Sequence, residues 1–299
     1  MVNALNATFG RHSKARASHA KGLCAKGVFA PLPSAAAFST TPIFMPGHYP
    51  AKVRFSIAGG SPHVSDKAPA ARGMAIDISW PHKERLVLAM ISAPVFFAAN
   101  GESFLAYLDA RRPDPATGKP DPARIEAANK LHTDSEAQRR WLAATPPSTS
   151  YATAPYFAVH TYLFSQGDGT KKPARWIFEP LAGRVGLTPD AAKDMPDHFL
   201  DGELISRLAQ GPAEWKVLLA LPEPVDPLHN PTAAWPENRK TVEVGRFSVV
   251  SHVAEGSAED FNAHVFDPEH LPSGVEPAGD PIFSFRSRAY SVSASRRGL

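Results

Sequence analysis

Proline and glycine interrupt this chain from end to end and limit what it can fold into. The 299 residues include 30 prolines and 20 glycines. Both residues are unfavourable inside helices, and they mark turns between short elements. The pattern therefore predicts many strands joined by turns instead of a helix bundle. With 43% hydrophobic residues, the chain can bury the core of one large domain or of two ordinary ones.

Short segments of alternating hydrophobicity, each closed by glycine or proline, predict the strands. A nearly continuous apolar run over 85–98 predicts a segment that lies wholly inside. Residues 156–182 predict a hairpin with "QGDGTKK" as its turn. Roughly six to eight strands separated by turns favour a barrel or another closed sheet. The other predicted strand segments are 21–32, 51–60, 72–80, 214–222 and 241–253.

Longer segments predict helices around this sheet. One begins at Asn100, whose side chain suits an N-cap. It opens a polar helical insert at about 100–145. The last predicted helix crosses to the core, and the fold class is therefore α+β. The predicted helical segments are 100–112, 122–131, 135–144, 189–211 and 282–297.

Charge and cysteine content exclude several kinds of protein. The 32 basic and 29 acidic residues are spread along the chain and leave a formal charge of +3, which does not predict a nucleic-acid-binding surface. The single cysteine, Cys24, cannot form an internal disulfide and favours a small buried thiol. No apolar run approaches the roughly 18 residues of a membrane span. The N-terminus lacks a secretory signal, so we expect a cytoplasmic protein, or a periplasmic one if an export signal has been removed.

The stretch "KARASHAKG" places His19 among small side chains, three residues after Arg16. A histidine in an apolar setting is commonly a core residue with one satisfied nitrogen, and less often an acid–base group. Since the chain has 12 histidines, this pattern alone leaves both interpretations open.

Two arginine patterns indicate a nearby anion. Arg54 in "VRFS" interrupts an apolar strand, and an inward guanidinium needs a ligand or a carboxylate of the fold as its partner. In "RSRAYSVSASRR", Arg286 and Tyr290 lie four residues apart, so on a helix the guanidinium can approach the phenol oxygen and favour its phenolate. Arg297 falls on the same face, although a solvated surface stripe explains this spacing equally well.

A series of motifs occurs in the order and approximate spacing found in haem catalases. They are "RASHAKG", "VRFS", "RGMA", "PVFF", "VHTY", "FDPEHLPSGVEP" and "RSRAY", from about residue 10 to Arg297. The short chain resembles the catalase-related peroxidases, a minimal branch of that superfamily. The resemblance implies one haem-binding domain over 1–299, built as a catalase-like antiparallel β-barrel with surrounding helices and a C-terminal proximal helix. It also implies haem b as the cofactor.

The resemblance assigns a residue to each side of the haem. His19 corresponds to the distal histidine, which takes a proton from the inner oxygen of a peroxide and returns it to the leaving oxygen. Tyr290 corresponds to the proximal ligand, which binds iron as a phenolate. Arg286 would keep that phenolate ionised.

Other matched positions would surround the cofactor. Three arginines correspond to those that hold the haem propionates. The phenylalanines of "PVFF" would line the haem pocket, a serine would lie on its distal side and a histidine near its proximal face. A further phenylalanine starts the "FDP" segment that leads into the proximal helix. In this order, the residues are Arg16, Arg54 and Arg297; Phe96 and Phe97; Ser56; His160; and Phe266.

Two positions depart from the family pattern. A typical catalase carries "NNTP" where this chain has "ISAP", which places Ile91 in the position of the distal asparagine, unless a one-residue shift places Ser92 there. Without that amide, oxidation of a second peroxide should suffer most, so peroxidase turnover is expected, with at most weak catalase activity. Ser18 stands where catalases usually have a valine. The long N-terminal arm and the C-terminal helical or flavodoxin-like extensions have no counterpart, so we expect a monomer or homodimer.

Three functions remain open within this resemblance. The first is a haem peroxidase that reduces hydrogen peroxide or organic hydroperoxides with a small-molecule electron donor. The second is an enzyme that rearranges lipid hydroperoxides, as allene oxide synthases do, or performs a specialised biosynthetic oxidation. The third is a haem-binding or haem-sensing protein without turnover, against which His19 argues because storage needs no distal acid–base group. The sequence contains no nucleotide-binding loop and no G-x-S-x-G elbow.

Overall fold

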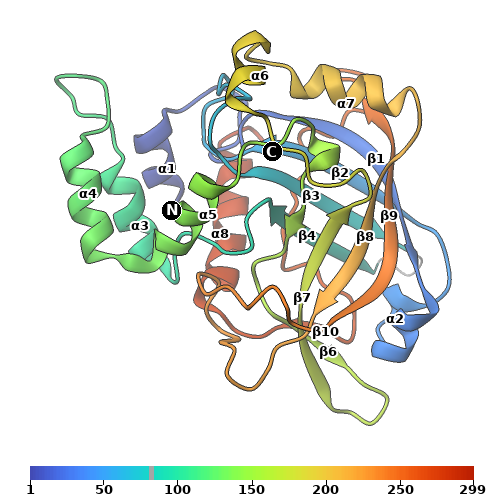
Figure 1. The fold of residues 1–299 in the computed structure, drawn as a ribbon. Helices are drawn as coiled ribbons and strands as arrows, with labels where there is room; N and C mark the ends of the chain where they lie inside the picture. The colour runs from blue at the N-terminus through green and yellow to red at the C-terminus, as the bar shows by residue number, and fades with distance from the viewer. Residues whose placement is uncertain (81–83) are drawn as a thin grey trace.

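The computed structural model describes residues 1–80 and 84–299, and its centre is a closed antiparallel barrel (Figure 1). The ring runs β1-β2-β3-β4-β5-β7-β8-β9 and closes where β9 pairs with β1. Two short strands, β6 and β10, extend the sheet from β7. The predicted antiparallel barrel is thus confirmed. The bounds are β1 Gly22–Pro31, β2 Tyr49–Ile57, β3 Arg72–Ser79, β4 Arg85–Ile91, β5 Tyr156–Phe157, β6 Tyr162–Ser165, β7 Lys171–Pro180, β8 Ala213–Ala220, β9 Thr241–Val253 and β10 Val275–Pro277.

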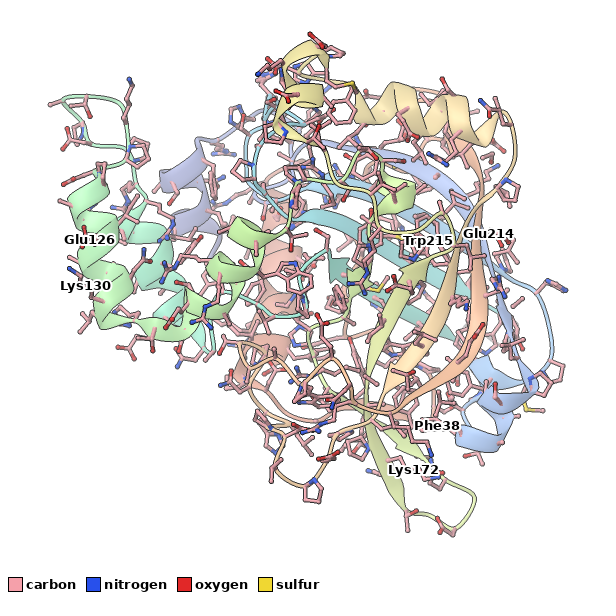
Figure 2. All side chains as sticks on the ribbon, in the orientation of Figure 1. Phe38, Glu126, Lys130, Lys172, Glu214 and Trp215 are labelled. Atoms are coloured by element: carbon pink, nitrogen blue, oxygen red, sulfur yellow. The ribbon has the colours of Figure 1, made fainter. Side chains whose placement is uncertain are left out.

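Alternation along the strands fills the barrel with large side chains. On β8, Trp215 is fully buried and donates to the carbonyl of Ala154, whereas its neighbour Glu214 accepts a hydrogen bond from Ser248 on β9 (Figure 2). The ring of Phe55 stacks on Tyr151 with centroids 5.1 Å apart. Each fully buried side chain of this kind contributes about 1.5–3 kcal/mol of hydrophobic stabilisation. Because aromatic side chains pack the interior, a ligand site has to lie outside the barrel.

Helices surround the barrel, and α8 lies between it and the helical segment that joins β4 to β5 (Figure 1). The predicted cap on α3 is confirmed, because Asn100 and Ser103 form a reciprocal capping box. No helix within the described ranges is long and apolar enough to cross a membrane. The bounds are α1 Val2–Phe9, α2 Pro33–Phe38, α3 Gly101–Ala110, α4 Pro122–Leu131, α5 Glu136–Ala144, α6 Pro189–Asp194, α7 Leu200–Leu208 and α8 Pro281–Ser295.

The prediction of one helical segment over 189–211 is wrong. The chain instead forms α6 and α7 with a break between them. Met195 has an extended backbone, as expected for a residue before proline, which disfavours the helical conformation. A hydrogen bond stabilises the chain at this break: the backbone N–H of Leu200, at the start of α7, donates to the Asp66 carboxylate at 2.8 Å.

Two strand predictions also need correction. The apolar run 85–98 forms a strand only as far as Ile91, because the Ser92 hydroxyl then accepts the backbone N–H of Arg72 and Pro94 follows. The run also does not lie wholly inside, since Phe96 and Phe97 are partly exposed. The hairpin over 156–182 consists of three strands, and its tight turn joins β6 to β7.

Helices α1 and α2 were not predicted from the sequence pattern. Helix α1 buries Val2 and Leu5 in a cluster with residues of α3 and α8, and the Thr8 hydroxyl donates to the Leu108 carbonyl at 3.0 Å. Its position depends on these tertiary contacts, since an isolated helix of eight residues is unstable in water.

Candidate active site

His19 lies in the segment before β1 and has a backbone φ of 53°, in the left-handed region that non-glycine residues rarely adopt. Hydrogen bonds hold this conformation in place. Arg54 on β2 donates to the His19 carbonyl at 2.9 Å, and the next residue, Ala20, donates to the Gly59 carbonyl at 3.2 Å. The imidazole Nδ1 lies 2.9 Å from the hydroxyl oxygen of Ser56. The structure therefore brings His19, Arg54 and Ser56 together, as the sequence predicts.

A row of cross-strand pairs forms the wall beside His19. Gly22, Ser56, Gly73 and Ile91 are paired in turn across β1, β2, β3 and β4, and directly paired residues project from the same face of a sheet. A Cβ atom at Gly73 would lie 2.8 Å from His19 Nδ1 and 2.4 Å from the Ser56 hydroxyl oxygen. Only glycine leaves room for the imidazole at this position.

The same row settles which residue of "ISAP" shares the face of Ser56 and Gly73. Ile91 is the direct partner of Gly73 on β4. Ser92 is engaged elsewhere, since its hydroxyl accepts the N–H of Arg72 and its carbonyl accepts the indole N–H of Trp141. An aliphatic side chain therefore occupies this end of the wall, and no amide is present there.

Burial and positive charge keep the His19 imidazole neutral. Burial is the larger cause, and the guanidinium groups of Arg54, Arg286 and Arg16 add to it, lowering the pKa of His19 from 6.5 to about 3. At neutral pH the ring therefore has one nitrogen lone pair free to accept a proton. If Nδ1–H donates to Ser56, this free nitrogen is Nε2.

Helix α8 carries the second group of polar side chains. Arg286 lies one turn before Tyr290, and its Nη2 donates to the phenol oxygen at 2.7 Å. Its Nη1 donates to Nε2 of the buried His160 at 2.8 Å, and Nδ1 of His160 lies 2.7 Å from a carboxylate oxygen of Asp280. Because a guanidinium has no acceptor, Nε2 of His160 must accept and Nδ1–H must donate to Asp280.

This chain of hydrogen bonds has consistent protonation states. Burial lowers the pKa of His160, so its imidazole is neutral. Burial opposes the charge of Arg286, but the adjacent Tyr290 holds the pKa of Arg286 above its usual value. The other carboxylate oxygen of Asp280 accepts the backbone N–H groups of Ile282 and Phe283. Asp280 thus caps α8 and orients His160 at the same time.

Three further arginines converge from distant parts of the sequence. Arg16 donates to the carbonyls of Asn262 and His264, Arg54 to the side chain of Asn262, and Arg297 approaches the Ala263 carbonyl at 3.5 Å. None of the three forms an ion pair with a carboxylate in the part of the chain that the structure describes. Burial, together with the charges of Arg54 and Arg297, lowers the pKa of Arg16 from 12.5 to about 9. Such a cluster is suited to a ligand with more than one negative charge.

The predicted phenylalanines lie in two aromatic groups, and Phe96 and Phe97 pack against a buried cluster that includes Ala17. Phe96 and Phe97 have ring centroids 4.4 Å apart, and Phe104 on α3 connects them to Phe285 on α8. Phe266 is buried and packs edge-on against His264, 4.9 Å between centroids. Cys24 is buried on β1, which confirms the expected buried thiol, and burial raises its pKa to about 11.

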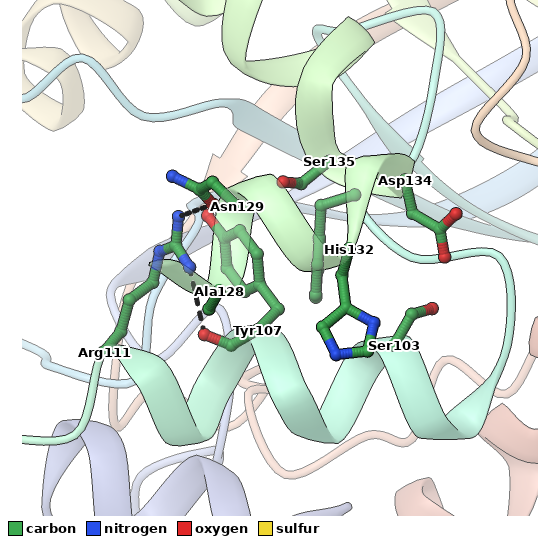
Figure 3. A pocket seen from close by; sticks show the side chains of 9 residues that line it. Ser103, Tyr107, Arg111, Ala128, Asn129, His132, Asp134 and Ser135 are labelled. Atoms are coloured by element: carbon green, nitrogen blue, oxygen red, sulfur yellow. Dashed lines mark hydrogen bonds between the residues drawn. The ribbon is translucent and has the colours of Figure 1, made fainter. Parts of the chain in front are cut away.

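Phe97 also borders a small hollow between α3 and α4 (Figure 3). Arg111 spans this hollow by donating to the Asn129 side chain at 3.2 Å and to the Tyr107 carbonyl at 3.1 Å. The bond to Asn129 joins α3 to α4, which explains the contact as a structural feature of the insert.

Several residues that shape the site were not predicted. Asp66 is fully buried. One of its carboxylate oxygens accepts a hydrogen bond of 2.5 Å from Nζ of Lys21, which lies two residues after His19 in the chain. The Asp66 carbonyl accepts a hydrogen bond from Arg72, next to Gly73. Asp66 thus anchors both segments that meet at the imidazole. The "RGMA" motif marked Gly73, but no local pattern indicates that residues 21 and 66 form an ion pair.

Comparisons with known proteins identify the family of this chain. A sequence model of the catalase family matches residues 6–298. The chain is similar to a catalase-related peroxidase of Synechococcus elongatus, with 36% identity over 99% of this chain and 87% of that protein. A catalase-related peroxidase of Mycolicibacterium paratuberculosis is 29% identical over 99% of this chain and 93% of its own length. A crystal structure of a fungal catalase superposes with a TM-score of 0.85 and 19% identity, covering 96% of this chain and 60% of that one. The chain therefore belongs to the catalase family, as one of its catalase-related peroxidases.

Proposed function

We propose that this protein is a haem peroxidase that reduces hydrogen peroxide or organic hydroperoxides with a small-molecule electron donor. The observation that carries the proposal is the pair of hydrogen bonds that orient the two groups: His19 Nδ1 lies 2.9 Å from the Ser56 hydroxyl, and Arg286 donates to the Tyr290 oxygen at 2.7 Å. Burial, with a smaller contribution from Arg286 and other guanidinium groups, lowers the pKa of His19 and leaves its imidazole neutral. A proton acceptor and a phenol oxygen paired with a cation thus belong to one site. Its catalase-related relatives support peroxide as the substrate.

The residues present fit a bound haem b. Its two propionates would find the guanidinium groups of Arg16, Arg54 and Arg297, which have no carboxylate partner in the described ranges. Arg16 Nε is buried and has no hydrogen-bond partner among the described residues, as expected for a donor that serves a ligand. The Tyr290 oxygen would supply the iron ligand, and the phenylalanine pair would contact the ring. When bound, haem supplies the redox chemistry that splits the O–O bond.

The residues of this chain move the protons of that reaction. With haem bound, His19 would accept a proton from one oxygen of the peroxide and return it to the departing oxygen, which would leave as water or an alcohol. The hydrogen bond between Nδ1 and Ser56 fixes the ring orientation. Arg286, held in place by His160 and Asp280, would stabilise negative charge on the Tyr290 oxygen when that oxygen binds iron.

Ile91 favours the peroxidase reaction over the catalase reaction. Oxidation of a second peroxide gains from an amide that holds that molecule beside His19, and Ile91 cannot form a hydrogen bond with it. The two electrons then come from an external donor. We propose a single domain that works as a monomer or homodimer. Rearrangement of lipid hydroperoxides is the alternative enzymatic function.

Absorption spectroscopy of the purified protein and two variants tests this function. We expect a high-spin ferric spectrum typical of tyrosinate ligation. His19→Ala should keep that spectrum and lose peroxide reactivity by about 10²–10⁴-fold, whereas Tyr290→Phe should impair haem binding. Normal peroxide turnover in both variants, or a wild-type protein that binds no haem, would contradict the proposal.

Turnover assays separate the alternatives. Wild type should oxidise a dye donor in the presence of peroxide. Rapid oxygen release without a donor would indicate a true catalase, and conversion of a fatty-acid hydroperoxide without a donor would indicate the rearrangement.

A further inference from the structure

The two ends of the chain, residues 1–65 with His19 and residues 281–299 with Tyr290, contain no acidic residues. Asp66 is the first acidic residue in the sequence, and none follows Asp280. The structure packs these segments together, because α1 contacts α8 and the backbone N–H of Ala17 approaches the Ser293 hydroxyl at 3.4 Å. Although the chain has a formal charge of only +3, every side chain charged at neutral pH in these two ends is therefore basic.

A small hollow lies at this junction. It is lined by Val2, Asn6, Arg11, His12, Ala15, Ala17, Ser293 and Arg296. Ala17 is two residues from His19, and Ser293 is three residues from Tyr290. Two of its lining residues, Ala17 and Ser293, therefore belong to the segments that carry the proposed distal and proximal residues. We call it the N–C hollow.

The positive charges around the N–C hollow have no acidic partner. Arg11 and Arg296 are exposed. Arg296 donates to the amide oxygens of Asn6 and Asn3, which are neutral. Within residues 1–80 and 84–299, neither Arg11 nor Arg296 forms an ion pair, whereas most exposed arginines elsewhere do, including Arg112 and Arg140.

Bound haem would not remove this charge. Its two propionates would neutralise two of the three guanidinium groups of Arg16, Arg54 and Arg297. One of these charges, together with Arg11 and Arg296, would remain at the edge of the site. A field of one sign at the entrance to a reaction centre raises the local concentration of oppositely charged substrates.

We propose that the N–C hollow is the docking site of the electron donor, and that the donor is a small organic anion. This inference rests on the proposed peroxidase function. Each donor molecule gives up one electron, so two donor anions and two protons convert one hydroperoxide into an alcohol and water and leave two donor radicals. The anionic group lies between Arg11 and Arg296, and the oxidisable ring faces Ala17 and Ser293.

Binding of a dianionic dye, 2,2′-azinobis(3-ethylbenzothiazoline-6-sulfonate), to the resting holoenzyme without peroxide tests the proposal directly. Arg11→Gln should weaken the equilibrium binding of this dye by about fivefold, and higher salt should reduce the difference between variant and wild type. Arg140→Gln removes an equal charge from α5 and serves as the matched control, which should bind the dye like wild type. Arg296→Gln should also weaken dye binding. Arg296→Lys keeps the positive charge and should retain most of the wild-type affinity for the dye.

Turnover measurements complete the test. Arg11→Gln should raise KM for the dianionic dye by a similar factor and leave kcat and the KM for guaiacol, a neutral donor, unchanged. Haem content should equal that of wild type. Unchanged dye affinity in Arg11→Gln, or equal effects on both donors, would overturn the docking site. If wild type oxidises neither donor, the peroxidase function itself fails, whatever the binding results.

Discussion

Gly73 lies directly against the imidazole of His19, so close that a methyl group at position 73 would lie 2.8 Å from Nδ1. Both the Ser56 hydroxyl and the His19 ring occupy the space that any other side chain would need. The shape of the β-barrel surface therefore decides where the proposed acid–base group stands.

Gly73→Ala should displace His19 without unfolding the barrel. Because the added methyl overlaps the imidazole and the Ser56 hydroxyl, we expect the rate of reaction with hydrogen peroxide to fall by about 10²-fold or more. Stopped-flow absorption at the haem band measures this rate. Gly202→Ala is the control, because a Cβ there meets nothing within 4 Å, and it should react like wild type. An unchanged rate in Gly73→Ala would show that the ring does not need this space.

The pH dependence of peroxide reactivity should reflect the low pKa of His19. With a pKa near 3, the imidazole is neutral, and able to accept a proton, throughout the range from pH 5 to 8. The rate of the first reaction with peroxide should therefore be flat over this range and fall only below about pH 4. A decline centred near pH 6.5 would contradict the buried, charge-surrounded environment.

The same shift should affect stability. An unfolded His19 has a pKa near 6.5, so the unfolded chain binds a proton more readily than the folded chain between pH 6.5 and 3. The stabilising contribution of this residue is complete above pH 6.5 and decreases as the pH falls. Urea unfolding of the haem-free protein should show a weaker loss of stability over this range in His19→Gln, which cannot titrate. Equal slopes in the two proteins would contradict the shift.

Asp66→Asn should destabilise the protein and disturb His19. It leaves Lys21 without its buried carboxylate partner, which typically costs about 3–5 kcal/mol. Denaturant unfolding measures this cost, and Lys21→Met combined with Asp66→Asn should recover part of it. Asp197→Asn is the control, since that exposed carboxylate pairs with Lys67 at the surface, and its unfolding free energy should be nearly unchanged. A similar small effect in Asp66→Asn would rule out the anchoring role.

Asp280→Asn separates the two roles of this residue. Asparagine caps helices well, so the cap on α8 should survive, but the amide cannot accept the His160 proton as a carboxylate does. We expect a loss of about 1.5–3 kcal/mol in unfolding free energy and a shifted haem spectrum, because His160 no longer orients Arg286 beside Tyr290. Asp121→Asn, at the exposed cap of α4, should change neither quantity. Equal effects of the two substitutions would limit Asp280 to capping.

Local patterns predicted most of the secondary structure. The strands of the barrel and the helix that carries Tyr290 were expected from alternation, breakers and capping residues. The failures occurred where tertiary contacts override local preference. The strand at 85–91 ends because Ser92 bonds to Arg72, and the helix expected over 189–211 breaks at Pro196, where Asp66 accepts the N–H of Leu200.

The fold class, the family resemblance and the nature of the groups that could act on peroxide follow from the amino-acid sequence alone. These depend on hydrophobic periodicity and short motifs, which are properties of neighbouring residues. Which of these groups meet depends on the tertiary structure, because closing the barrel brings together residues that lie far apart in the chain. The tertiary contacts set three features of the site. Ile91 shares the wall of Gly73, Asp66 anchors the His19 segment, and the two acid-free ends of the chain join beside Arg16 and Arg297.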